Sequence, residues 1–148
     1  MMLFILQLAS CAVMTGLIWV IQILHYPAFA LIREERFSEF HVFHSKYITY
    51  IVGPVMLIEL ATASLLVVKF SEQKFFWANL FFLLLIWGCT ALLSVPIHND
   101  LALQQDQDLI NKLVATNWPR TILWSLRLIA LMIFFLQVMD VDSGNLIK

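Results

Sequence analysis

Polar side chains gather at the same end of four hydrophobic segments in this sequence. They are His25, His41, His44, His98, Asn99, Asn117 and Arg120, and they include every histidine of the chain. Histidine transfers protons near neutral pH and is the commonest metal ligand in proteins. Arginine and asparagine orient or stabilise a negatively charged oxygen. Because polar groups in hydrocarbon are costly, this gathering predicts a functional site.

One interpretation is an enzyme site made of His98, Asn99, Asn117 and Arg120. Imidazole has an ordinary pKa of about 6.5, so His98 would act as a general base or a ligand. Asn99 and Asn117 would orient a substrate oxygen, and Arg120 would stabilise a developing phenolate or enolate. The predicted chemistry is therefore proton removal beside a stabilised oxyanion.

The other interpretation is a metal or haem site whose ligands are His25, His41, His44 and His98. His41 and His44 are three residues apart, a spacing that lets two histidines on a helix ligate one metal ion. Glu59 is about 27 Å along the helix from His41, which argues against a di-iron carboxylate centre. A transition metal or haem is thus a candidate cofactor. Simple hydrogen bonding of the histidines to headgroups and water remains open.

Two charged residues fall deep inside apolar segments. Counting along helices, Glu59 lies about 20 Å beyond Lys46 and Arg127 about 15 Å beyond the start of the last segment. Isolated charges at that depth are very costly in free energy. An arginine side chain is long enough to span the difference in depth between the two residues. We therefore expect Glu59 and Arg127 to form a structural intramembrane pair, with a catalytic or proton-relay role as the alternative.

The composition is that of one integral membrane domain covering residues 1–148. The chain is 61% hydrophobic and 13% charged, whereas soluble domains average about 45–50% apolar and about 25% charged residues. Its net charge of −1 offers no basic surface for nucleic acid. The lipid bilayer is the expected partner, and oligomerisation is left open.

Four segments have the length of membrane-crossing helices, which need about 20 apolar residues. They cover about 3–29, 38–70, 75–97 and 117–139. The predicted fold is all-α, an antiparallel bundle of four transmembrane helices. Asn117 is the expected N-cap of the last helix, with Pro119 in its first turn, and the loop 99–118 is expected to hold a short amphipathic surface helix.

The two connections 30–46 and 98–118 define one end of the bundle, which we call side A. Side A carries five Lys or Arg residues and the opposite end, side B, carries three. The positive-inside rule therefore favours a cytoplasmic side A in a multi-pass protein of the inner or cell membrane. In the last helix, Asn117, Arg120, Trp124 and Arg127 share one face, which we expect to point inward.

Two short motifs resemble the anthrone oxygenase-like family of small four-helix membrane proteins, whose bacterial members are mostly of unknown function. They are Val-Pro-Ile-His-Asn-Asp-Leu at 95–101 and Asn-Trp-Pro-Arg-Thr at 117–121. The resemblance implies the fold, a site at His98, Asn99, Asn117 and Arg120, and oxygenation of an anthrone to an anthraquinone without a required cofactor. This chain departs from the family pattern by having His98 where the family has asparagine, and by its additional histidines.

The sequence therefore predicts an oxidoreductase or oxygenase-like membrane enzyme that acts on a small, lipophilic, aromatic substrate. The alternative is a non-catalytic protein, either a metal- or haem-binding module or an accessory subunit of a membrane assembly. In the accessory subunit, the polar stripes would only hold the helices together.

Overall fold

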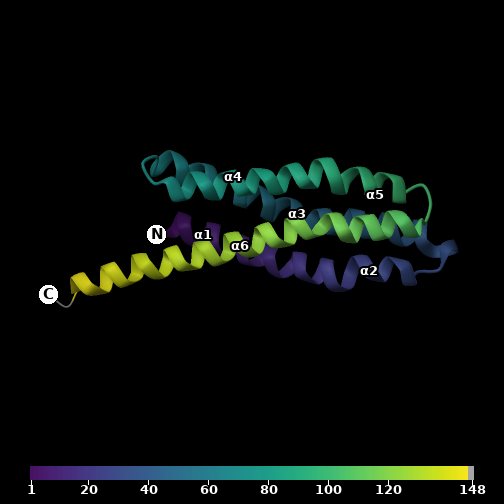
Figure 1. Cartoon of the computed structure of the whole chain (residues 1–148), viewed down its shortest axis with the longest axis horizontal. Helices are drawn as coiled ribbons and strands as arrows, with labels where there is room; N and C mark the ends of the chain where they lie inside the picture. The colour runs from purple at the N-terminus through teal and green to yellow at the C-terminus, as the bar shows by residue number, and fades with distance from the viewer. Residues whose placement is uncertain (147–148) are drawn as a thin grey trace.

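The computed structural model describes the backbone of residues 1–146 and the side chains of residues 1–139. It is an antiparallel bundle of four long helical segments (Figure 1). The first segment consists of α1 (Met2–Val20), η1 (Ile21–His25), α2 (Tyr26–Ala28) and η2 (Phe29–Leu31). The others are α3 (Glu34–Lys69), then α4 (Lys74–Cys89) with η3 (Thr90–Ser94) and α5 (Val95–Leu101), and finally α6 (Gln107–Leu146). The described residues contain no strand, so the predicted all-α fold is confirmed.

All four segments are long and apolar enough to cross a membrane, and the chain is a multi-pass membrane protein. Within the bundle, α1 and α4 each lie between α3 and α6. Large apolar side chains cover the outside, among them Val68 and Leu92, which are 78% and 77% exposed in the isolated chain. A bilayer would cover this surface with acyl chains.

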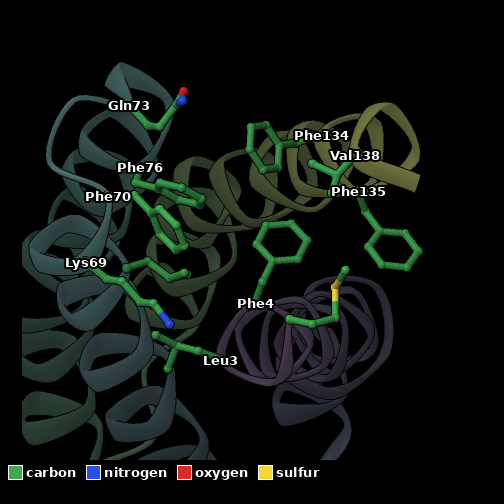
Figure 2. Close-up of a pocket in the computed structure, with 11 residues that line it drawn as sticks. Leu3, Phe4, Lys69, Phe70, Gln73, Phe76, Phe134, Phe135 and Val138 are labelled. Atoms are coloured by element: carbon green, nitrogen blue, oxygen red, sulfur yellow. The ribbon is translucent and has the colours of Figure 1, made fainter. Parts of the chain in front are cut away.

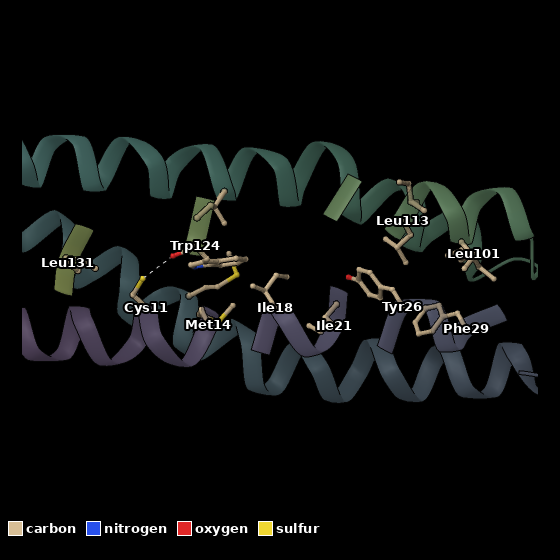
Figure 3. Packing of buried hydrophobic residues seen from close by; sticks show 14 of the residues in the cluster. Cys11, Met14, Ile18, Ile21, Tyr26, Phe29, Leu101, Leu113, Trp124 and Leu131 are labelled. Atoms are coloured by element: carbon tan, nitrogen blue, oxygen red, sulfur yellow. Dashed lines mark hydrogen bonds between the residues drawn. The ribbon is translucent and has the colours of Figure 1, made fainter. Parts of the chain in front are cut away.

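The centre of the bundle is packed with side chains from α1 and α6 (Figure 3). Met14, Trp124 and Leu131 are almost completely buried. Lipid tails are as apolar as these side chains, so close packing and interhelical hydrogen bonds hold the helices together. One such bond is donated by the Thr15 hydroxyl to the Trp124 carbonyl over 3.3 Å.

The last helix begins much earlier than the sequence predicts. α6 starts at Gln107, so Asn117 is not its N-cap, Pro119 lies in its interior, and the expected separate surface helix is its first part. The cap is Asp106, whose carboxylate accepts the backbone N–H groups of Asp108 and Leu109 over 2.8 and 3.0 Å. The apolar stripe of the expected surface helix faces the bundle instead of a membrane surface, since Ile110 and Leu113 are buried.

The other boundaries shift by a few residues toward side A. The first segment extends to Leu31, the second begins at Glu34 and the third continues to Leu101. Two of these segments contain a π-helical turn, η1 and η3, and each turn ends two residues before a proline, Pro27 or Pro96. A proline ring clashes with the carbonyl group one turn earlier, and a wider π-turn relieves this clash without ending the helix.

Candidate functional site

The four histidines meet at side A, the end of the bundle where α2 and α5 are labelled in Figure 1. His25 Nε2 is 2.6 Å from His44 Nδ1, and His41 Nε2 is 3.2 Å from His98 Nδ1. The rings of His44 and His98 are stacked with centroids 5.7 Å apart, which joins the two pairs. The structure thus brings together four side chains that are up to 73 positions apart in the sequence.

Helix geometry and one aromatic side chain position this cluster. His25 is the last residue of the π-turn η1, and His98 follows the π-turn η3 by four residues. Phe29, which is completely buried, packs edge-on against His44 and His41 at centroid distances of 5.2 and 6.1 Å. Phe29 therefore restricts the positions that these two imidazole rings can take.

A hydrogen-bond chain connects the cluster to Arg120. Arg120 Nη2 donates to the Tyr26 hydroxyl oxygen over 3.5 Å, and this oxygen is 3.1 Å from His98 Nε2. A guanidinium group only donates hydrogen bonds, so the Tyr26 hydrogen is available to His98 Nε2. In the tautomer of His98 that accepts this hydrogen at Nε2, Nδ1 carries the ring hydrogen and donates to His41 Nε2 over 3.2 Å. With that tautomer, the chain runs in one direction from Arg120 through Tyr26 and His98 to His41.

Asn117 holds Arg120 in place. Its Oδ1 accepts a hydrogen bond from Arg120 Nη2, and its Nδ2 donates to Gln22 Oε1 over 2.8 Å. The Thr121 hydroxyl donates to the same Gln22 oxygen over 3.3 Å. Gln22, Asn117 and Thr121 are buried. Asn117 thus acts as a positioning residue for the guanidinium group.

Asn99 lies apart from this network. Its side chain is exposed and lines a pocket of about 380 Å³ between α3 and α5 at side A. His41, His44 and His98 line the same pocket. The structure therefore brings His98, Asn117 and Arg120 into one network and leaves Asn99 at its rim.

A second pocket, of about 360 Å³, lies in the middle of the bundle, and we call it the central pocket. Tyr26, His98 and Arg120 line it together with mostly apolar side chains from α1, α3, α4, η3 and α6. Ile48, Thr49, Val95 and His98 line both this pocket and the one at side A. His98 therefore lies between the apolar central pocket and the pocket at side A.

Several polar atoms at the central pocket have no hydrogen-bond partner among residues 1–139. They are Trp87 Nε1, Ser94 Oγ and Arg120 Nε, each of them buried. All three residues line the central pocket. Buried donors are nearly always satisfied in native proteins. The pocket is thus suited to a ligand that carries oxygen acceptors.

A second polar cluster lies deeper in the bundle, toward side B. Arg127 Nη1 forms an ion pair with Glu59 Oε1 at 2.8 Å, and both side chains are buried. Trp124 Nε1 donates to Glu59 Oε2 over 3.0 Å, and Arg127 Nε donates to Asn79 Oδ1 over 3.2 Å. The structure thus joins Glu59 to Arg127 and separates them from the histidines.

In the described part of the chain, no group of three or more His, Cys, Asp or Glu side chains is arranged to hold a metal ion. Four of the eight imidazole nitrogens instead form the two His–His contacts described above.

A further pocket, of about 240 Å³, opens at side B among phenylalanine side chains such as Phe4, Phe70 and Phe76 (Figure 2). None of the predicted site residues lines it.

Sequence reasoning missed Tyr26, Gln22 and the pocket donors Trp87 and Ser94 as site residues. Spacing offered a signal for some of them. Gln22 and Tyr26 are four residues apart at the end of the first segment, and Ser94 is four residues before His98. Nothing in the sequence indicated that Tyr26 would bridge His98 and Arg120.

Comparison with known proteins adds no assignment, since no family model, curated protein or solved structure matches this chain.

Proposed function

We propose that this protein is an oxygenase-like membrane enzyme that binds a small, lipophilic, aromatic molecule in the central pocket and removes a proton from it. The observation that carries the proposal is the hydrogen-bond chain of Arg120, Tyr26 and His98 at the wall of an apolar pocket of about 360 Å³. Trp87 and Ser94 supply further polar contacts for a substrate oxygen. We place the protein in the inner or cell membrane with side A in the cytoplasm.

The residues would share the chemistry as follows. The substrate proton passes to the Tyr26 oxygen as the Tyr26 hydrogen passes to His98 Nε2, and Arg120 stabilises the resulting phenolate or enolate. Dioxygen is the oxidant. A methylene group between two aromatic rings then becomes a carbonyl group, with one oxygen atom entering the product and the other leaving as water. The proton held by His98 returns to that water, so the protein ends unchanged.

Filling the central pocket tests the proposal. A Cβ atom added at Gly53, which lines this pocket, meets no atom within 4 Å. Gly53→Leu should therefore fold normally and weaken binding of 1-naphthol, measured by titration calorimetry in detergent, at least tenfold. Gly16→Leu is the matched control, because a Cβ atom there also meets nothing within 4 Å and Gly16 faces outward. Equal binding by wild type and both variants would contradict the proposal.

The second candidate function is that of a metal- or haem-binding module, and the meeting of four histidines at side A favours it. His41 Nδ1 and His44 Nε2 are buried and, within residues 1–139, have no hydrogen-bond partner. Metal analysis and an optical spectrum of protein purified without chelator separate the two functions. Our proposal predicts much less than one transition metal per chain and no Soret band. Stoichiometric metal or haem that is lost in His41→Ala would favour the second function.

A further inference from the structure

The deep cluster around Arg127 has more hydrogen-bond donors than acceptors. Both carboxylate oxygens of Glu59 and the side-chain oxygen of Asn79 accept bonds. Asn79 Nδ2 and Arg127 Nη2 are buried and lack a partner within the described side chains. Flipping the Asn79 amide does not provide the missing acceptor, because the amide nitrogen would then face another donor, Arg127 Nε. The cluster thus lacks an acceptor.

A hollow of about 140 Å³ adjoins these two donors. Asn79 and Arg127 line it together with Phe75, Phe82 and Ala130, and it lies between α4 and α6. Ala130 and Phe82 are exposed, so the hollow borders the lipid-facing surface of the bundle. An apolar protein cavity of about 150 Å³ holds one benzene molecule. The size and the phenylalanine walls therefore suit one six-membered ring or a comparable group.

We propose that this hollow binds the carbonyl oxygen of an uncharged, bilayer-soluble molecule, with Asn79 and Arg127 as its donors. The oxygen must be an acceptor because both free groups are donors. The ligand is uncharged because Glu59 already neutralises Arg127, and a second anion would compete for the same guanidinium group. A ring carbonyl, as in a quinone, and the ester carbonyl of a glycerolipid share this chemistry. The site lies two turns from Arg120 along α6 and is independent of the proposed enzyme activity.

Titrations of delipidated protein in detergent test the site, and Gly53→Leu is present throughout to block the central pocket. The probes are decylbenzoquinone, dihexanoylphosphatidylcholine, and decylbenzene as an analogue without oxygen. We expect saturable binding of at least one carbonyl probe and at least tenfold weaker binding of decylbenzene. Adding Ala130→Leu, which fills the hollow, should weaken carbonyl binding at least tenfold. Adding Ala61→Leu, on the exposed surface of α3, should leave it unchanged.

Each outcome decides the proposal. Binding of the quinone alone or of the lipid alone supports the site and identifies the source of the carbonyl group. Absence of saturable binding, equal binding of decylbenzene, or unchanged binding in Ala130→Leu overturns it. Thermal unfolding of every variant in the same detergent shows whether the fold is retained. The result does not depend on whether 1-naphthol binds the central pocket.

Discussion

Arg127→Met should destabilise the protein by about 3–5 kcal/mol, which is the cost of leaving the buried Glu59 carboxylate without its partner. Arg127 and Glu59 are 2% and 0% exposed, so neither solvent nor headgroups can replace the ion pair. The same substitution removes the donor to Asn79. The measurement is equilibrium unfolding by SDS in mixed micelles, followed by tryptophan fluorescence.

The double variant Glu59→Gln with Arg127→Met separates a charge effect from a packing effect. It removes both charges and keeps an acceptor for Trp124 Nε1, so it should recover most of the lost stability. Lys112→Met is a control, because this charge lies on the exposed surface at the start of α6. If the double variant is as unstable as Arg127→Met alone, the ion pair does not explain the effect.

Under the proposed function, His98→Leu and Arg120→Met should each lower the rate of anthrone oxidation about 100-fold or more. Leucine is close to histidine in size but has no basic nitrogen, so it removes the acceptor of the substrate proton. Methionine is close to arginine in length but cannot stabilise an oxyanion. Dioxygen uptake by the purified protein with anthrone as substrate measures both effects.

Asn99→Ala is the informative comparison, because the family resemblance implies a site role for this residue and the structure leaves it exposed at the rim. We expect a change of only a few-fold, with folding unaffected. Retention of the wild-type rate by His98→Leu would show that the base lies elsewhere. A loss in Asn99→Ala as large as that in Arg120→Met would show that the reaction occurs in the side A pocket.

The sequence was informative about the fold because the bilayer imposes strong constraints. Apolar segments of sufficient length predict helices, and the antiparallel order places the histidines at one end. The spacing of Asn117, Arg120, Trp124 and Arg127 also predicts a shared inward face, and all four side chains are buried. The similar depths of Glu59 and Arg127 along their helices were enough to predict that these two residues form a pair.

Local geometry at side A could not be predicted in the same way. The predicted start of α6 was wrong because Asn117, followed two positions later by Pro119, matches a helix start as well as Asp106 does. The π-turns before Pro27 and Pro96 each add a residue to a turn, which rotates Tyr26 and His98 relative to an ideal helix. Spacing on an ideal helix therefore cannot show that Tyr26 would lie between His98 and Arg120.

The most direct test of the central claim is the absorption spectrum of 1-naphthol bound to the purified protein at pH 7. A phenol has an ordinary pKa of about 10, as in tyrosine, and is neutral in water at this pH. If His98, Tyr26 and Arg120 remove and stabilise its proton, the bound molecule should show the spectrum of the naphtholate anion, and Arg120→Met should abolish this signal. Naphthol that binds only in its neutral form, or that does not bind saturably, would contradict the account.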